Sequence, residues 1–206
     1  MSIYNPEIHK RRSIRLKDYD YSQAGAYFIT ICIKDRECLF GNIVDREMRI
    51  NSAGEMVLKA WNDLPAKYSN VRIDEFIVMP NHVHGIIILY VGAGPCACPV
   101  YKYDGNLLNA EGYGRPSSEK RQSQIKGQPQ GVAPTISLSD IVHRFKSFTT
   151  SQYRINVLHN NWPPFPGKLW QRNYYEHIIR NETELNKIRE YIINNPLNWE
   201  SDENYR

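Results

Sequence analysis

Two histidines separated by a single residue offer the clearest chemistry in this sequence. His82, Val83 and His84 are followed at once by the apolar run Gly85–Leu89. The run is short and rich in β-branched residues, so it predicts a buried strand. Side chains alternate faces along a strand, so the two imidazoles point the same way, with Cβ atoms roughly 6–7 Å apart. Such a pair can hold one metal ion, or it can be two hydrogen-bonded histidines near a sheet end.

A tyrosine and an asparagine four residues apart form the second candidate pair. The last helix should begin at a cap formed by Asn181 with Glu184 and end before Pro196. A phenol is a poor nucleophile at neutral pH unless its target is activated. A divalent ion held by the two histidines could activate a phosphate. The inward-facing stripe of this helix would carry Ile188, Tyr191, Ile192 and Asn195.

Asn195 could then supply a third ligand to the ion, one helical turn beyond Tyr191. The alternative is structural: a buried Tyr191 whose hydroxyl is satisfied by an asparagine at the end of the helix.

The elements that must position these residues follow the split β-α-β order of a ferredoxin-like fold. A capping box at Ser52–Glu55 starts one helix, and Ser137 with Asp140 starts another. We therefore predict an α+β protein with an antiparallel sheet, helices on one face, and a C-terminal helix that carries the tyrosine. The predicted strands cover 27–33, 71–78, 83–89 and 169–180, an extended segment covers 39–44, and the second helix should bury Ile141, Val142, Phe145 and Phe148.

The length of 206 residues fits one domain with additions. We expect a basic arm over residues 1–20 and a catalytic domain over 21–200. A segment rich in Gly, Pro, Ser and Gln, residues 91–134, interrupts that domain as a flexible gate or as tolerated sequence. The net charge of +4 permits an anionic partner without requiring one. No membrane-length apolar run is present, so we expect a cytoplasmic protein without a membrane partner.

Several blocks of the chain, in the right order, resemble the single-tyrosine HUH transposases, and most closely their REP-associated branch. The likeness covers roughly residues 11–200 apart from the insertion. The blocks are Gly25–Thr30, Leu39–Gly41, Met79–Gly85, Leu169–Arg180 and Tyr191–Pro196.

The resemblance implies a metal-dependent endonuclease and strand transferase acting on single-stranded DNA. His82 and His84 match the histidines that bind Mg²⁺ or Mn²⁺, and Tyr191 matches the nucleophile that forms a 5′-phosphotyrosine. Asn195 stands where many members have a glutamine as third ligand. The family also implies a homodimer that recognises hairpins formed by palindromic DNA.

Basic side chains are candidates for contacts to DNA phosphates. An arm of this kind is either a solvated surface or a phosphate-contacting segment, and the resemblance favours the second interpretation. The candidates in the arm are Lys10, Arg11, Arg12 and Arg15, and those in the domain are Arg144, Lys146, Arg172 and Arg180.

Two further tyrosines, Tyr174 and Tyr175, are rival nucleophiles beside Arg172 and His177. They lie on a predicted strand and have no Asn or Gln at ligand spacing, so Tyr191 is preferred. His177 itself is interpreted as a core histidine rather than as a group supporting the site.

Two other functions compete with nuclease activity. A ferredoxin-like sheet with exposed aromatic side chains can bind structured DNA or RNA without cleaving it. A replication initiator or relaxase would share the chemistry, but such proteins often carry further domains.

Overall fold

The computed structural model describes residues 21–90, 136–202, 204 and 205. The expected arm 1–20 and insertion 91–134 lie outside these residues. The strands are β1 (Gly25–Cys32), β2 (Gly41–Val44), β3 (Glu47–Ile50), β4 (Val71–Val78), β5 (His82–Leu89) and β6 (Tyr175–Ile179). The helices are α1 (Ser52–Asn62), α2 (Leu64–Lys67), α3 (Leu138–His159) and α4 (Glu182–Ile193), with 3₁₀ turns η1 (Lys34–Arg36) and η2 (Asn195–Ser201).

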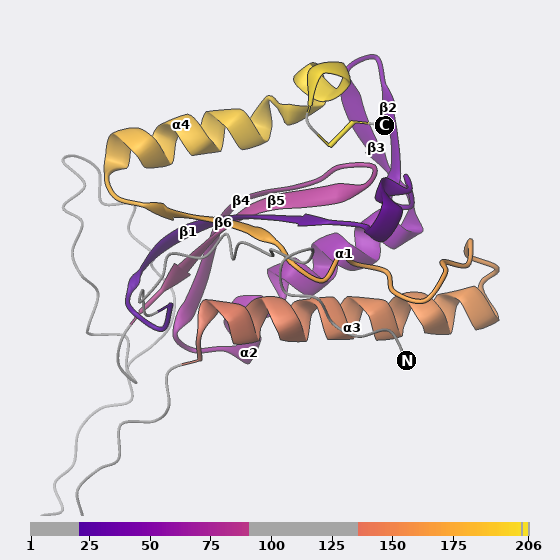
Figure 1. Cartoon of the computed structure of the whole chain (residues 1–206), viewed down its shortest axis with the longest axis horizontal. Coiled ribbons are helices and arrows are strands. Elements are labelled where there is room, and N and C mark those ends of the chain that lie inside the picture. The colour runs from indigo at the N-terminus through magenta and orange to yellow at the C-terminus, as the bar shows by residue number, and fades with distance from the viewer. Residues whose placement is uncertain (1–20, 91–135, 203, 206) are drawn as a thin grey trace, which may run out of the picture.

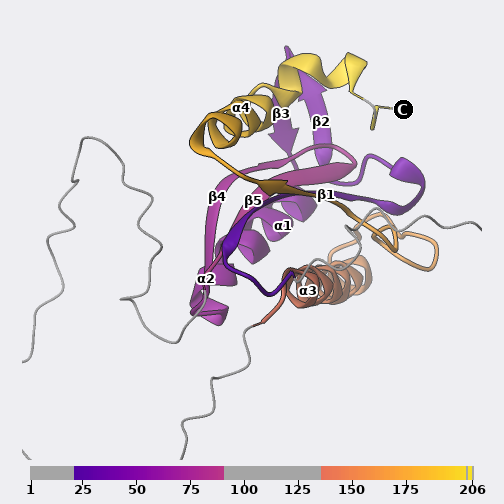
Figure 2. The same cartoon turned by 60° about the vertical axis from the view of Figure 1, so that its left-hand side comes forward.

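Four strands form an antiparallel sheet in the order β4-β5-β1-β6. This is the predicted ferredoxin-like arrangement, since the two split β-α-β units interleave their strands. Helices α1 and α3 cover one face, and α4 lies across the opposite face (Figure 1). The turned view shows the sheet as a layer between α4 and the α1–α3 pair (Figure 2). Among the described α-helices, the C-terminal helix α4 thus lies on the face opposite to α1 and α3 (Figure 1).

The two faces have separate apolar cores. The larger core lies under α1 and α3 and contains Tyr27, Trp61 and Phe145. The smaller lies under α4, where Phe28, Ile86, Ile179 and Ile192 pack together. Because strand residues alternate, the even-numbered positions of β5 face α4 and the odd-numbered ones face the larger core. His82 and His84 therefore belong to the α4 face, and they point the same way, as predicted.

Gly85 allows the larger core to approach β5 closely. A Cβ atom at this position would lie 2.5 Å from the Trp61 ring and 2.8 Å from Phe76. These two rings stack at 4.2 Å beneath the strand. The Trp61 indole therefore packs against one face of β5, and His82 and His84 project from its other face.

Several predicted details are wrong by a residue or more. Asn51, not Ser52, caps α1, because its side chain accepts from the backbone of Ala53 and Gly54. Phe148 is 42% exposed rather than buried, since the buried face of α3 continues through Thr149.

The predicted strand over 169–180 is reduced to β6. Before β6, only an isolated bridge between Ile33 and Trp170 remains. The carbonyls of 171–173 turn to the Lys146 ammonium instead of a neighbouring strand.

The segment 39–44 contributes β2, which pairs with the unpredicted β3 in a separate ribbon. Asp45 and Arg46 make its turn with positive φ angles of 52° and 64°. This hairpin lacks the Asn-Gly or Asp-Gly signal that reveals such turns in a sequence.

Candidate active site on the α4 face

The outer ring nitrogens of both histidines are held by neighbouring side chains. His84 Nδ1 lies 2.8 Å from Thr30 Oγ1, on the paired strand β1. His82 Nδ1 lies 2.8 Å from Asn81 Oδ1. The Asn81 amide nitrogen donates to the carbonyls of Arg36 and Asn204, which leaves Oδ1 as the acceptor for His82. His82 thus carries its proton on Nδ1 and keeps an Nε2 lone pair.

The inner nitrogens converge. His82 Nε2 and His84 Nε2 are 2.9 Å apart, and the two residues are 0% and 1% exposed. Burial lowers the pKa of His82 to about 4, against a partial opposing effect of Asp202, and Arg36 lowers it further. Burial, together with neighbouring His82, also lowers the pKa of His84 well below its usual value. Both imidazoles are therefore neutral at pH 7, which is the form that binds a metal.

A carboxylate completes the cluster. One ligand atom each from His82, His84 and Asp202 lies within 4.8 Å of the others. Two imidazoles and a carboxylate form a donor set typical of divalent transition metals. The residues therefore fit an ion. Asp202 follows η2, and no helical or strand spacing connects it with the histidines, so the sequence pattern did not reveal it.

Asn195, the predicted third ligand, is buried but lies outside α4. The helix ends at Ile193, and Asn195 begins η2. Its amide nitrogen donates to Asp202 Oδ2 at 3.1 Å. Its Oδ1 is buried and has no hydrogen-bond partner among the described residues. Asn195 thus orients Asp202, and its own metal ligation stays a prediction.

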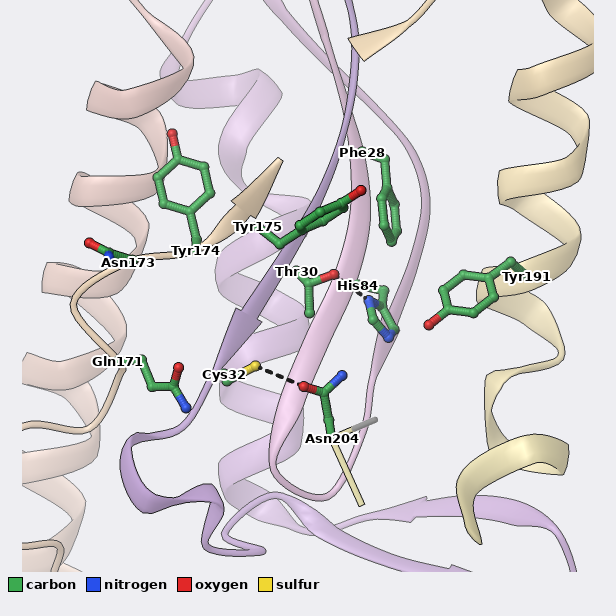
Figure 3. A pocket seen from close by; sticks show the side chains of 10 residues that line it. All are labelled: Phe28, Thr30, Cys32, His84, Gln171, Asn173, Tyr174, Tyr175, Tyr191 and Asn204. Atoms are coloured by element: carbon green, nitrogen blue, oxygen red, sulfur yellow. Dashed lines mark hydrogen bonds between the residues drawn. The ribbon is translucent and has the colours of Figure 1, made fainter. Parts of the chain in front are cut away.

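Tyr191 lies on α4 and approaches the histidines from that helix. Its ring centroid is 5.3 Å from that of His84 and 6.0 Å from that of Phe28. Figure 3 shows the hydroxyl directed towards the His84 side of the pocket. Tyr191 is 46% exposed. The prediction that it belongs to a buried stripe of the helix is therefore wrong. Ile192 is the buried residue that seats this end of α4.

The rival tyrosines line the same cavity but are oriented differently. Tyr175 contacts Phe28 edge-on at 6.2 Å. Tyr174 packs against the larger core, with the Lys146 ammonium 5.4 Å from its ring centroid. Figure 3 shows the Tyr174 hydroxyl pointing away from His84. Only Tyr191, among these three, has a described ring contact with a histidine of the cluster.

The basic candidates are scattered. Lys146 donates to the backbone carbonyls of Gln171, Arg172 and Asn173, at 2.9, 3.4 and 3.1 Å, so its ammonium supports this turn. Arg144 lies over Tyr68, on the α3 side of the sheet. Arg172 and Arg180 are exposed near the two ends of β6. The arm candidates 10–15 lie outside the described residues, and phosphate contact stays a prediction for all of them.

Contrary to the prediction, His177 is not a core histidine. Its side chain is 35% exposed, and Nε2 lies 2.7 Å from Glu184 Oε1. Glu184 also accepts from the Arg180 backbone, and these hydrogen bonds lower the pKa of its carboxyl. The pair fixes the start of α4, where Asn181 caps the helix as predicted.

In the described part of the chain, no helix combines the length and the apolarity needed to cross a bilayer.

Comparisons with known proteins add three findings. The family model described as "Transposase IS200 like" matches residues 131–195, which include Tyr191 and Asn195 but not the two histidines. An uncharacterized protein of Haemophilus influenzae is 45% identical over 204 residues, 98% of this chain and 97% of that protein.

The structure of a REP-associated tyrosine transposase bound to a REP hairpin has a similar fold. The TM-score is 0.50 at 16% identity, over 89% of this chain and 73% of that one. The His-x-His strand, the facing tyrosine helix and the family match agree with one another. Over residues 131–195 the chain is similar to the family of IS200-like transposases, and its fold is similar to that of a REP-associated tyrosine transposase.

Proposed function

We propose that this protein is a metal-dependent endonuclease and strand transferase for single-stranded DNA, in which Tyr191 is the nucleophile. The observation that carries the proposal is the placement of Tyr191 against His84, with ring centroids 5.3 Å apart, beside three converging ligand atoms. A helix and a strand more than a hundred residues apart meet at one point on the α4 face. The tyrosine is 46% exposed, so its hydroxyl is not held in a buried core.

His82 Nε2, His84 Nε2 and the Asp202 carboxylate would hold the ion, with Mn²⁺ or Mg²⁺ as candidates. When bound, the ion supplies Lewis-acid polarisation of a phosphate oxygen. Asn81 and Thr30 keep the two imidazoles oriented with their Nε2 atoms inwards. Asn195 holds Asp202 by its amide nitrogen. These hydrogen bonds fix the ligands before an ion arrives, which lowers the cost of binding it.

Tyr191 Oη attacks the phosphorus of the scissile phosphodiester. The bond from phosphorus to the 3′ oxygen breaks, and a 5′-phosphotyrosine forms. The phenol loses its proton, and the departing 3′ oxygen gains one to become a 3′ hydroxyl. Attack of a 3′ hydroxyl on the phosphotyrosine reverses the sequence and joins strands.

Hairpin DNA is the proposed partner. The similar solved structure is bound to a REP hairpin, and the family match agrees with a DNA substrate. A homodimer stays a prediction. Sedimentation of the full chain measures its oligomeric state. The inverted repeats to be tried first are those in the DNA on either side of the gene.

Covalent adduct formation tests the proposal. Hairpins with single-stranded flanks, labelled at the 3′ end, are incubated with the full chain and Mn²⁺, and the adduct is separated under denaturing conditions. We expect an adduct from the parent protein and none from Tyr191→Phe or after chelation. Tyr174→Phe and Tyr175→Phe should still form it.

An undiminished adduct in Tyr191→Phe would overturn the assignment of the nucleophile. Binding that survives chelation, with no adduct from any hairpin, would favour the non-cleaving binding protein instead.

A further inference from the structure

The cavity beside the histidines is larger than the proposed chemistry needs. It has a volume of about 590 Å³. His84 and Tyr191 form one end, and Gln171 and Asn173 form the opposite wall, with Phe28 and Tyr175 between them (Figure 3). Cleavage uses only the first end. The remaining space falls within the range of pockets that enclose small ligands.

An exposed aromatic ring stands in the middle of this cavity. Tyr175 begins β6, where it pairs with Thr30, and is 46% exposed. Phe28 supports it edge-on, with ring centroids 6.2 Å apart. Exposed rings of this kind serve as stacking platforms for the bases of single-stranded nucleic acids, because every base offers a π face.

The polar wall is fixed in position from two sides. Lys146 donates to the three successive carbonyls of 171–173. The Gln171 backbone nitrogen donates to the Cys32 carbonyl at 2.9 Å, and its side-chain nitrogen donates to the Ile33 carbonyl at 3.4 Å. This leaves Gln171 Oε1 as a hydrogen-bond acceptor on the cavity wall. Lys146 is a positioning residue for this wall.

We propose that the Gln171–Tyr175 end of the cavity binds one unpaired nucleobase, adjacent to the phosphate that Tyr191 attacks. The inference rests on the proposed function and adds a sequence preference to it. Tyr175 stacks on the base, and Gln171 Oε1 accepts from its exocyclic amine. Adenine, cytosine and guanine carry such an amine and thymine does not. The subsite therefore favours these three bases over thymine at one position of the strand.

The test separates binding from cleavage by using Tyr191→Phe protein, which cannot consume the DNA. The probe is a pool of DNA hairpins with ten-nucleotide randomised single-stranded flanks. Retained molecules are sequenced, and the affinity of the best one is measured by fluorescence anisotropy. Gln171→Met and Tyr175→Leu are added to the Tyr191→Phe background. Phe148→Leu is the matched control, because Phe148 is 42% exposed on the opposite side of the sheet.

We expect thymine to be depleted at one flank position. Gln171→Met should remove the depletion at that position and leave any other preference unchanged. Tyr175→Leu should weaken DNA binding about tenfold. An abasic site at the selected position should weaken binding to the Tyr191→Phe protein but not to the protein that also carries Tyr175→Leu. Phe148→Leu should change neither profile nor affinity.

Three outcomes would overturn the subsite: no thymine depletion, depletion that survives Gln171→Met, or an abasic effect that survives Tyr175→Leu. Each is distinct from failure of the proposed function, which shows as absence of the adduct with intact Tyr191. Absence of any hairpin binding would overturn both.

Discussion

The histidine pair is prepared by residues that touch only its outer nitrogens. Thr30 and Asn81 hold the two Nδ1 atoms, so the Nε2 atoms meet at 2.9 Å in a buried site. This contact is a hydrogen bond in which one imidazole donates to the other, and a cation bound between the rings would replace that proton. The same burial makes protonation costly, and this has a measurable effect on stability.

Acid should destabilise the metal-free protein through His82. Its pKa is about 4 in the folded chain, against 6.5 for an unperturbed histidine. Between these values the unfolded chain binds a proton that the folded chain does not, so stability is lost as the pH falls below about 6.5. We expect a loss of about 2 kcal/mol between pH 7 and pH 5 from this residue. Urea titrations of the chelated protein at both pH values measure it.

His82→Gln is the comparison for this measurement. Its stability should depend less on pH over the same interval, although His84 still contributes. An equally steep dependence in His82→Gln would show that other groups cause the acid sensitivity.

Thr30→Val should weaken metal binding without altering the ligands themselves. Valine keeps the shape of the buried threonine but cannot hold His84 Nδ1. Loss of such a supporting hydrogen bond typically lowers metal affinity about 10–100-fold. Calorimetric titration with Mn²⁺ measures the change. Thr150→Val is the control, because the described hydrogen bond of the Thr150 hydroxyl lies within α3, to the Lys146 carbonyl. Equal affinities in Thr30→Val and the parent would exclude the supporting role.

At the scale of elements, α4 is the part whose position decides the reaction. It packs on the small apolar cluster through Ile192 and is tied to β4 by a two-pronged ion pair. Arg189 Nε and one terminal nitrogen donate to the two oxygens of Asp74, at 2.7 and 2.6 Å. Asp74 lies where the β4–β5 register shifts, and such irregularities redirect side chains. The Arg189 hydrogen bond is the main cause that lowers the pKa of Asp74.

Arg189→Met should therefore impair catalysis more than stability. We expect a stability loss of about 1–2 kcal/mol, since both partners are partly exposed. A small displacement of Tyr191 should slow adduct formation by about tenfold or more. The matched control is Arg49→Met, whose pair with Glu47 is over 60% exposed on both sides and should cost less than about 0.5 kcal/mol. Adduct formation at the parent rate in Arg189→Met would show that the ion pair does not position the tyrosine.

At the scale of the whole molecule, the proposed site joins distant parts of the chain. β5 supplies the histidines, α4 the tyrosine, and the segment after η2 the carboxylate. Asn204 adds a further link, because its backbone carbonyl accepts from Asn81 and its side chain accepts from Cys32. Burial raises the pKa of the Cys32 thiol, which keeps it protonated as the donor.

Mn²⁺ should therefore stabilise the whole fold, because the ion would cross-link β5 to the C-terminal segment. An ion present at about a hundred times its Kd contributes about 2.7 kcal/mol. Thermal unfolding with Mn²⁺ and after chelation measures the shift in Tm. Asp202→Asn should lose most of it, whereas Glu200→Gln, which alters an exposed acid two residues earlier, should keep it. A full shift in Asp202→Asn would mean that Asp202 is not a ligand.

Local patterns in the sequence determined the sheet, the order of its strands and the shared face of His82 and His84. Strand periodicity and helix caps act over a few residues, so they can be followed along the chain. The end of α4 was harder to interpret, because Tyr191 and Asn195 have helical spacing although the helix stops between them.

Only the tertiary structure decided how the site is completed. Thr30 reaches His84 through strand pairing, and Asp202 reaches both histidines through the return of the C-terminal segment. Neither contact has a fixed spacing in the sequence. Gln171 faces the cavity because Lys146 gathers the carbonyls that would otherwise have extended β6. Short-range propensities fix elements, whereas contacts between elements depend on which faces are buried together.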